Sequence, residues 1–436
     1  MPSPAPPSSP DADGDAATPP APVPAMESQA ELPDHLVEDI LVRLPAAVDL
    51  GRASMAAASF HRTIAGHSFL RRFRALHPPP LLGILTYNSA HHKTLWPSFL
   101  PAQPPHPSAA IAALTLAAAD FSCSFLPSRE LWSHCDYRDG RILLSKKGDF
   151  LANVAVCDPL HRRYLLLPAI PDDLAALSRQ MDVTHCDPFL APAGEDEGGN
   201  GDAPLGFRVM CLRMSSTNLV LFVFSSSGAR AGQWHTVTFD GWGAFMNSEW
   251  VVLGTFPDTP DTRRYYAHGC FYWEIPYPCK LLVFDTRTEE FSFVSLPDRR
   301  RQNTFVEATD GRLGMYSRRV RDRLLDDGMR ADENHLLYDI LQDNGDGTKL
   351  WKREDVIQVP RNYRYNIIGV AGGCLLLHAY LHNPESPYGN NFNYYSIDRQ
   401  TLKIERFRGS RPVYISPDTH LYTGFPAIFV STYYLN

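Results

Sequence analysis

Between residues 33 and 45 the apolar positions recur with the period of a helix. In "PDHLVEDILVRL" (33–44) they follow the pattern i, i+1, i+4, i+5, i+8, which places them on one broad face of an α-helix. These positions are Leu36, Val37, Ile40, Leu41 and Leu44. Proline is favoured in a first helical turn and stops a helix further along, so Pro33 and Pro45 predict its two ends.

Two more helices are predicted before residue 78. Asp49 can cap an alanine-rich helix that runs to about Ser59, and Ser68 can cap a third segment. That segment has its apolar residues on one side: Phe69, Leu70, Phe73 and Leu76. Three consecutive prolines at 78–80 end the helical region. The pattern therefore predicts an all-α domain of three helices at residues 31–77.

After residue 80 the pattern becomes that of β-strands. Short runs rich in Val, Leu, Phe, Tyr and Trp are separated by glycine and proline. One phrase recurs, in which an apolar run, an aspartate, a turn and a second apolar run follow one another. It occurs at 154–171, 281–298 and 394–409, with a degenerate copy at 309–360. Each copy is predicted to be a hairpin whose turn opens with Asp158, Asp285 or Asp398, because aspartate can accept hydrogen bonds from its own turn.

A strand that begins after glycine precedes these hairpins, at 138–145, 267–275 and 370–380. One strand plus a hairpin, repeated every ~40–60 residues, indicates the blades of a β-propeller. Residues 81–436 suit about six blades, and we expect the last strand, 426–435, to pair with 81–87 and close the ring. The predicted fold is thus an α+β multidomain chain, with a small all-α domain followed by an all-β propeller.

Two segments are predicted to lie outside this folded structure. Residues 1–30 are rich in Pro and Ala, with small and acidic residues, and bury too little apolar surface to become ordered. The acidic, glycine-rich insert at 191–204 is predicted to be a mobile loop.

The composition argues against nucleic acid and membranes as partners of this protein. The net charge of −7 over 436 residues provides no cationic field for nucleic acid or anionic lipid. The first residues lack the basic and apolar regions of a secretory signal, and the apolar runs are too short to span a membrane. The eight cysteines include no Cys-x-x-Cys pair, which argues against a disulfide framework or a zinc ribbon. We therefore expect a protein of the cytoplasm or nucleus with no membrane or nucleic-acid partner.

The stretch "LPDHLVEDILVRLP…VDLGRASMAAASFHRTIAGHSFLRRF" resembles an F-box, and the match covers residues 31–73. The family often has Val-Cys-x-x-Trp in its second half, where this chain reads "SMAAASF" with Phe60 at the aromatic position. The C-terminal pattern resembles the F-box-associated propellers common in plant F-box proteins. The resemblance implies a substrate-recognition subunit of an SCF-type (Skp–cullin–F-box) ubiquitin ligase, itself without catalytic residues or cofactor.

The resemblance also implies which residues bind the Skp-type adaptor, and through it the cullin. They are Leu32, Pro33, Leu36, Ile40, Leu41, Leu44, Pro45, Leu50 and Phe60. Physical reasoning leads to a similar expectation, because a helical unit of fewer than ~50 residues is marginal alone and a partner helix would complete its apolar face. The alternative is that these residues only pack against the propeller.

A protein target is expected at aromatic-rich loops on the propeller rim, because Tyr and Trp dominate binding energy at interfaces. The candidates are Trp242, Phe245, Tyr363, Tyr365, Tyr388 and Phe392, which the pattern equally allows as packing between strands. Two rival functions remain open. One is an F-box scaffold or regulator outside degradation, and the other is a propeller enzyme with carboxylates at the axis.

Three further motifs contain residue types found in metal sites or in basic patches. The triplets His134-Cys135-Asp136 and His185-Cys186-Asp187 contain zinc-ligand types, but adjacent residues of a strand point to opposite faces, so no metal site is predicted. The stretch 343–349 has the residues of a hairpin turn and lacks the bidentate glutamate of a calcium loop. The arginines between 299 and 323 are interleaved with acidic residues, which favours a solvated mixed surface.

Overall fold

The computed structural model describes most of the chain from residue 32 onward. The described ranges are 32–44, 47–77, 79–86, 98–128, 132–146, 149–179, 181–183, 185–192, 206–248, 263–275, 279–297, 301–308, 310–319, 335–345, 348–360, 363–380, 392–410 and 419–424. The predicted leader, 1–30, and residues 193–204 of the predicted loop lie outside them, whereas residues 191 and 192 end a strand.

The N-terminal unit contains four short helices instead of the predicted three. They are α1 (Asp34–Leu41), α2 (Ala47–Ala56), α3 (Ala58–Ile64) and α4 (His67–Leu76). The predicted second helix is divided because Ala57 has an extended backbone (φ −152°, ψ 143°) and ends the run of helical residues. A small apolar core holds the unit together, formed by Val37, Leu41, Val42, Leu50, Ile64, Phe69, Leu70 and Phe73.

Six antiparallel sheets follow, as the repeat predicts. The first complete blade contains β3 (Trp132–Arg138), β4 (Arg141–Lys146), β5 (Asp149–Asp158) and β6 (Arg163–Leu166). The second contains β7 (His185–Pro192), β8 (Phe207–Met214), β9 (Leu219–Ser225) and β10 (Trp234–Thr238). The third contains β11 (Arg264–Ala267), β12 (Cys270–Ile275), β13 (Lys280–Asp285) and β14 (Glu290–Ser295).

The fourth blade contains β15 (Arg301–Glu307), β16 (Leu313–Arg319), β17 (His335–Asp343) and β18 (Lys349–Gln358). The fifth contains β19 (Arg364–Ala371), β20 (Cys374–Tyr380), β21 (Phe392–Asp398) and β22 (Ile404–Ser410). The sixth sheet has three strands in the order β2 (Ser98–Pro101), β1 (Leu81–Thr86) and β23 (His420–Thr423).

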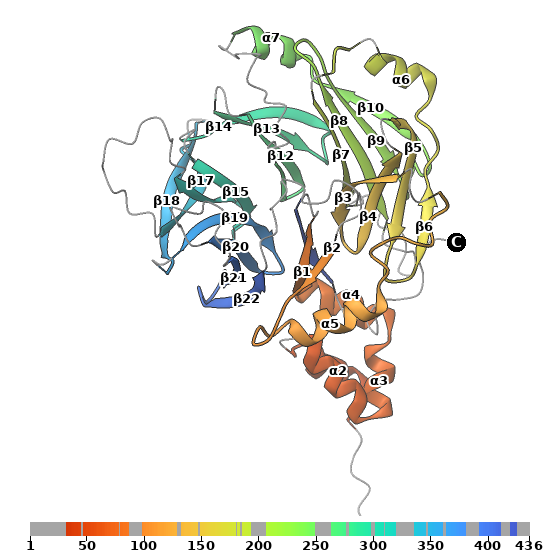
Figure 1. Ribbon diagram of the computed structural model, residues 1–436, viewed down its shortest axis with the longest axis vertical. Coiled ribbons are helices and arrows are strands. Elements are labelled where there is room, and N and C mark those ends of the chain that lie inside the picture. Colours follow the sequence, from red (N-terminus) through yellow and green to blue (C-terminus); the bar gives the residue numbers. More distant parts are fainter. Residues whose placement is uncertain are drawn as a thin grey trace, which may run out of the picture.

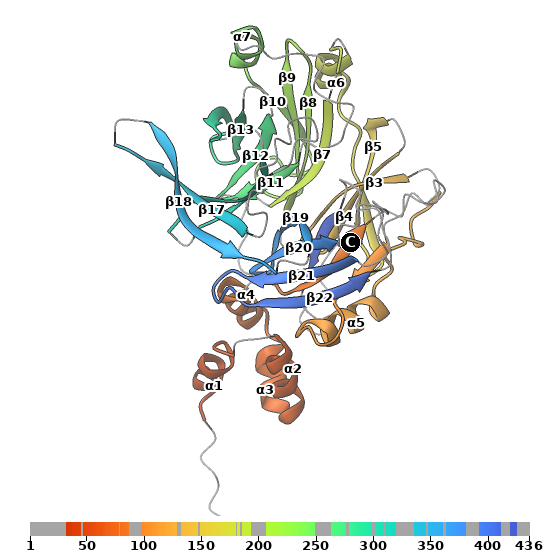
Figure 2. The same cartoon turned by 60° about the vertical axis from the view of Figure 1, so that its left-hand side comes forward.

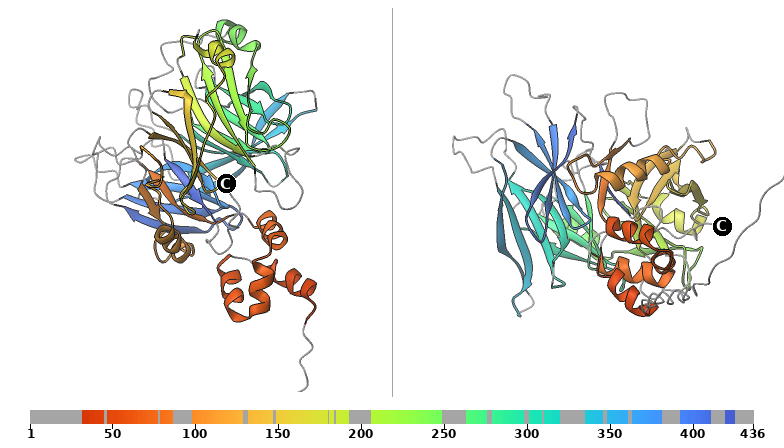
Figure 3. Two further views of the ribbon diagram at one scale, coloured as in Figure 1. Left: turned by 90° about the vertical axis from the view of Figure 1, so that its right-hand side faces the viewer. Right: turned by 90° about the horizontal axis from the view of Figure 1, so that it is seen from below.

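The six sheets stand around one axis, and the chain is a six-bladed β-propeller (Figure 1). The innermost strands β3, β7, β11, β15, β19 and β23 face the axis, and neighbouring ones pack side by side. Blade faces are covered by neighbouring blades, and apolar clusters fill the space between them. The β17–β18 hairpin extends beyond the ring (Figure 2), and the N-terminal helices lie outside the ring at one end of the molecule (Figure 3).

The turn chemistry predicted from the repeat is confirmed. The Asp158 carboxylate accepts hydrogen bonds from the backbone N–H groups of Leu160 and His161 at 3.0 and 3.1 Å. Asp285 and Asp398 accept equivalent bonds from the residues two and three positions later. The strand before each hairpin starts after a tight turn that needs positive φ, which glycine adopts at 140, 269 and 373.

The ring closes through β23 (His420–Thr423), a strand that begins six residues before the predicted closing segment, 426–435. His420, Leu421 and Tyr422 pair with Leu85, Ile84 and Gly83 of β1, and β2 occupies the other edge of β1. Both edges of β1 are therefore filled by described strands, and the predicted closing segment, 426–435, lies outside the described residues. Closure of the ring on β1 by a strand from the end of the propeller sequence was predicted correctly, and the strand that the structure pairs with β1 is β23.

Three short helices in the propeller region were not predicted. They are α5 (Ala109–Ala118), α6 (Asp172–Arg179) and α7 (Gly241–Ser248), which connect blades or strands at the periphery. Helix α7 replaces an expected aromatic loop, and its apolar residues enter the core of the second blade.

A short proline segment joins the helices to the propeller. Its second and third residues, Pro79 and Pro80, run against the turn at Gly372, where a Cβ atom would lie 2.8 Å from the Pro79 carbonyl oxygen and 2.5 Å from the Leu81 nitrogen. The Gly424 N–H donates to the Pro80 carbonyl oxygen at 3.3 Å. The joint is thus packed against the strands that close the ring.

Candidate functional site

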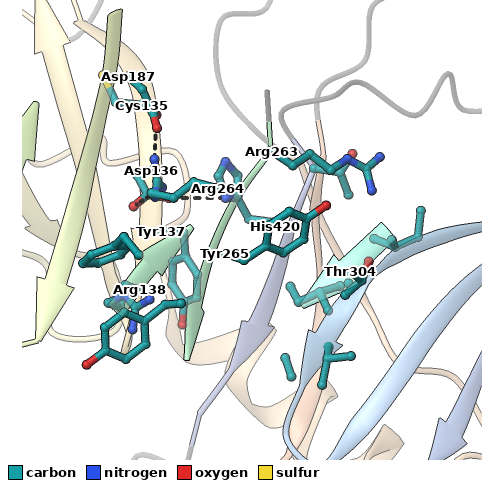
Figure 4. Close-up of a pocket in the computed structure, with 18 of the residues that line it drawn as sticks. Cys135, Asp136, Tyr137, Arg138, Asp187, Arg263, Arg264, Tyr265, Thr304 and His420 are labelled. Atoms are coloured by element: carbon teal, nitrogen blue, oxygen red, sulfur yellow. Dashed lines mark hydrogen bonds and ion pairs between the residues drawn. The ribbon is translucent and has the colours of Figure 1, made fainter. Parts of the chain in front are cut away.

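The innermost strands surround a cavity of about 550 Å³ on the propeller axis. Every blade contributes to its wall, and charged, histidine and tyrosine side chains from β3, β7, β11 and β23 are prominent there (Figure 4). Because inner-strand residues of all six sheets line it, the cavity collects side chains that are far apart in the sequence.

The main feature of the wall is an arginine held between two aspartates. Arg264 of β11 contacts Asp136 of β3 (Nη2 to Oδ2, 2.8 Å) and Asp187 of β7 (Nη1 to Oδ1, 2.5 Å). Asp136 also accepts a hydrogen bond from the Leu190 N–H, and Asp187 accepts one from the Trp273 indole N–H, both at 2.8 Å. We call this set of three charged residues the axial clamp. It links three consecutive blades.

The clamp is nearly closed to solvent. The side chains of Asp136, Arg264 and Asp187 are 5%, 14% and 17% exposed. The Arg264 guanidinium also lies 4.2 Å from the centre of the Phe189 ring, a cation–π contact. Burial lowers the pKa of Arg264, but the two carboxylates outweigh it, so its pKa lies above the ordinary value and the charge is kept.

Three histidines adjoin the clamp. The rings of His134 and His420 are 5.1 Å apart, and His420 Nδ1 lies 3.5 Å from Asp136 Oδ1. Burial, with a smaller effect from His420, holds the pKa of His134 well below its usual range. Burial also lowers the pKa of His185. His134 and His185 are therefore uncharged at neutral pH.

The structure brings the two His-Cys-Asp triplets to the same cavity wall, because β3 and β7 are neighbouring inner strands. Their carboxylates meet at Arg264, so the convergence produces an ion cluster. Among the residues that the structure describes, no group of three or more His, Cys, Asp or Glu side chains is arranged to hold a metal ion.

The predicted adaptor-binding residues divide into exposed and buried sets. Leu32, Leu36 and Ile40 are 56%, 41% and 56% exposed, and Pro33 is exposed beside them. Leu36 and Ile40 are one helical turn apart on one face of α1, and Leu32 comes two residues before the helix. We call these three residues the α1 row. It is the part of the predicted set that a partner can reach directly.

The remaining predicted residues that the structure describes belong to the helical core or pack against it. Leu41 and Leu50 are 4% and 0% exposed and belong to the helical core, so their prediction as direct contacts does not fit this structure. Leu44 and Phe60 are half-buried against the same core, and Pro45 lies outside the described residues.

Ion pairs fix α1 on α4. Arg72 contacts Asp39 (Nη2 to Oδ1, 2.6 Å) and Glu38 (Nη1 to Oε1, 3.6 Å). The acidic side of α1 therefore faces α4, while the α1 row stays uncovered by the described part of the chain.

Most of the predicted target-binding rim is interior. Trp242 is fully buried and donates its indole N–H to the Ser215 carbonyl oxygen at 2.8 Å, and Phe245 is 7% exposed in the same core. Tyr365 is 2% exposed and its hydroxyl donates to the Pro360 carbonyl oxygen. These three are packing residues, because the segments that carry them are a helix and a strand instead of open loops.

Tyr363 is half-buried beside Tyr365 and Tyr395, at ring distances of 6.3 and 6.0 Å. Tyr388 and the side chain of Phe392 lie outside the described residues. Among the predicted rim residues whose side chains the structure describes, Tyr363 is partly exposed and the others are buried.

Of the arginine-rich stretch, Arg312 pairs with Asp310, and Arg318 donates to the Asn366 side chain. At 343–349, the Asp343 carboxylate accepts the Gly345 N–H inside the β17–β18 turn, as expected for a hairpin. Sequence reasoning missed Arg264 altogether. The available signal was a pair of arginines immediately before the aromatic strand 265–267, in a position that the blade repeat assigns to the axis.

No protein-family model matches the sequence, and neither does any curated protein. Solved structures that resemble the chain include a streptogramin B lyase, at 10% identity over 64% of this chain and 82% of the lyase, with a TM-score of 0.25. A protein of unknown function from Bacteroides caccae shows 9% identity over 78% of this chain and 98% of its own, with a TM-score of 0.37.

A third structure, YCF48 bound to D1 peptide, shows 7% identity over 76% of this chain and 83% of its own, with a TM-score of 0.31. At this level of similarity the comparisons carry no functional argument. Within the described residues, no helix is both long and apolar enough to cross a membrane.

Proposed function

We propose that the chain is the substrate-recognition subunit of an SCF-type ubiquitin ligase in the cytoplasm or nucleus. Its N-terminal helices bind a Skp-type adaptor, which connects it to a cullin, and its propeller holds a protein target. The chain itself makes and breaks no bond. It acts by raising the concentration of target lysines near a charged ubiquitin carrier.

The exposure of the α1 row is the observation that carries the proposal. Leu32, Leu36 and Ile40 are exposed, while Val37 and Leu41 of the same helix are already buried in the helical core. Exposed apolar residues on one face of a helix are how that helix is recognised by another, and water contact is unfavourable for three large apolar side chains within nine residues. A helix of the adaptor would cover them.

The packed joint supports a second part of the proposal. Because Pro79 and Pro80 lie against the Gly372 turn, the propeller end of the joint is held in place, and we propose that the helices and the propeller keep a fixed relation. A fixed relation keeps the target near the ubiquitin carrier, whereas a long flexible tether would dilute it.

Adaptor capture by purified protein tests the proposal. Replacing a central anchor, as in Ile40→Asp, should cost about 2 kcal/mol or more, which weakens adaptor binding about 30-fold. Leu114→Asp is the matched control, because Leu114 is an equally apolar residue, 67% exposed, on α5 of the propeller region. Equal capture of adaptor and cullin by wild type and Ile40→Asp would refute the proposal.

A second candidate function is a propeller enzyme that works at the axis, favoured by the convergence of Asp136 and Asp187 in the cavity. Both carboxylates, however, are already bonded to Arg264 and to a further donor each. These ion pairs and hydrogen bonds account for the two carboxylates as groups that hold neighbouring blades together, so the ligase subunit is the better-supported proposal. A scaffold role outside degradation would use the same adaptor-binding helices but would not lead to ubiquitination of the target. Reconstitution with adaptor, cullin and ubiquitin distinguishes the scaffold from the ligase subunit, because only the ligase subunit would give a ubiquitinated target.

A further inference from the structure

Two thiols face each other across strands β7 and β8. The Sγ atoms of Cys186 and Cys211 are 3.6 Å apart. In the antiparallel register Cys186 pairs with Arg213 and Cys211 pairs with Pro188, so the cysteines are diagonal neighbours on one face of the sheet. The sulfurs are therefore in contact without being bonded.

The two thiols differ in access. Cys186 is exposed and lines the axial cavity, whereas Cys211 is fully buried behind it. A small molecule that enters the cavity meets residue Cys186, whereas Cys211 does not line the cavity.

The surroundings favour the thiolate at one position only. The hydrogen bond with Cys211, aided by the positive charge of Arg213, holds the pKa of Cys186 below its ordinary value. Burial raises the pKa of Cys211 well above its ordinary value. An accessible thiol of lowered pKa next to a buried thiol of raised pKa is the arrangement of a reacting and a resolving cysteine.

We propose that Cys186 and Cys211 are a redox modification site, in which a hydroperoxide entering the axial cavity oxidises Cys186 and Cys211 then closes a disulfide. The Cys186 thiolate attacks one peroxide oxygen, the O–O bond breaks, and the leaving oxygen takes a proton to give water or an alcohol. Cys186 is then a sulfenic acid.

In the second step the Cys211 sulfur attacks the Cys186 sulfur, and the S–O bond breaks. The departing hydroxyl takes the Cys211 proton and leaves as water. Each sulfur gives up one electron overall, the peroxide accepts the two, and a thiol reductant reverses the change.

The chain contains its own control pair. Cys123 and Cys157 also hydrogen-bond to each other, but both are fully buried in the core between the closing sheet and the first complete blade. The partner bond and burial raise the pKa of Cys157. These thiols should stay reduced under conditions that oxidise the Cys186–Cys211 pair.

A third thiol, Cys135, borders the same cavity and tests the pairing. Its Sγ donates to the Ser145 Oγ at 3.2 Å, and burial raises its pKa to about 12. We expect Cys135 to remain a thiol while Cys186 reacts.

The test treats the full chain with hydrogen peroxide, blocks free thiols, reduces, labels the released thiols with a second reagent, and maps the labels by mass spectrometry. The expected result is second-label incorporation at residues 186 and 211 together, abolished by prior treatment with a thiol reductant. Cys211→Ser should stop at a sulfenic acid on Cys186 that a dimedone probe captures, and Cys186→Ser should leave Cys211 unoxidised.

Circular dichroism of each variant before treatment reports whether it folds, and the wild-type labelling pattern decides the matter without any variant. Labelling at 123 and 157 to the same extent as at 186 and 211, a 135–186 linkage, or no linkage at all would each overturn the proposal.

Discussion

Removing the arginine of the axial clamp should destabilise the propeller far more than removing a surface arginine. In Arg264→Met the aliphatic stem is largely retained, but the carboxylates of Asp136 and Asp187 lose their shared cation. Each keeps one hydrogen-bond donor, the Leu190 N–H or the Trp273 indole. Two negative charges then face each other in a nearly closed wall.

The magnitude follows from burial. Removing one partner of a buried ion pair costs about 3–5 kcal/mol, because the remaining charge is poorly solvated. The matched control is Arg230→Met, whose Arg230–Glu289 pair is 56% and 31% exposed and belongs to the class worth about 0–1 kcal/mol. We therefore expect the free energy of unfolding to fall at least threefold more in Arg264→Met.

Urea unfolding followed by tryptophan fluorescence and circular dichroism measures this difference. The triple variant Asp136→Asn/Asp187→Asn/Arg264→Met removes all the charges and should recover most of the loss, since neutral replacement of buried ion clusters is often tolerated. If Arg264→Met unfolds at the same urea concentration as Arg230→Met, the clamp contributes nothing and the reasoning is wrong.

Three further outcomes are expected from calorimetry or urea unfolding of single variants. Gly372→Ala should lower the free energy of unfolding by about 1–3 kcal/mol, because its φ of +58° and the Leu81 nitrogen 2.5 Å from the new Cβ both oppose a side chain. Gly373→Ala is the control, because its Cβ would meet open space, and it should lower the free energy of unfolding by only about 1 kcal/mol. Equal losses in the two variants would contradict the packed joint. Trp242→Ala should lose about 3–5 kcal/mol as a core residue, and a stable variant with weakened target binding would restore it to the rim. Burial lowers the pKa of His378 to about 4, below its unfolded value near 6.5, so the unfolded state takes up the proton first as the pH falls. The free energy of unfolding should therefore decrease between pH 6.5 and pH 4, and His378→Phe should make this decrease smaller. An unchanged pH profile in the variant would exclude His378 as the cause.

The propeller could be predicted because its signals are local. An aspartate that opens a turn and a glycine that precedes a strand act within a few residues, so Asp158, Asp285 and Asp398 mark the same hairpin wherever they occur. The apolar period of α1 is equally local, and it predicted a helix that the structure contains.

The features that were not predicted depend on contacts between residues far apart in the sequence. Alanine favours a helix, so nothing in the sequence marks Ala57 as the break between α2 and α3. The aromatic residues of 240–250 gave no sign that a helix would turn Trp242 inward. The axial clamp joins residues 136, 187 and 264 through the closure of the ring, and no local pattern reports which inner-strand residues meet there.

The pairing of β23 with β1 has a consequence for synthesis. Thr86 and Thr419, which approach each other beside this pairing, are 333 residues apart, so β1 waits for its partner until almost all of the propeller has been made. At ~5–20 residues per second that interval is on the order of half a minute, during which the nascent chain carries an unpaired strand edge. The helices that precede β1 leave the ribosome long before the ring can close, so a stalled or shortened chain presents the α1 row, the proposed adaptor-binding surface, without a closed propeller.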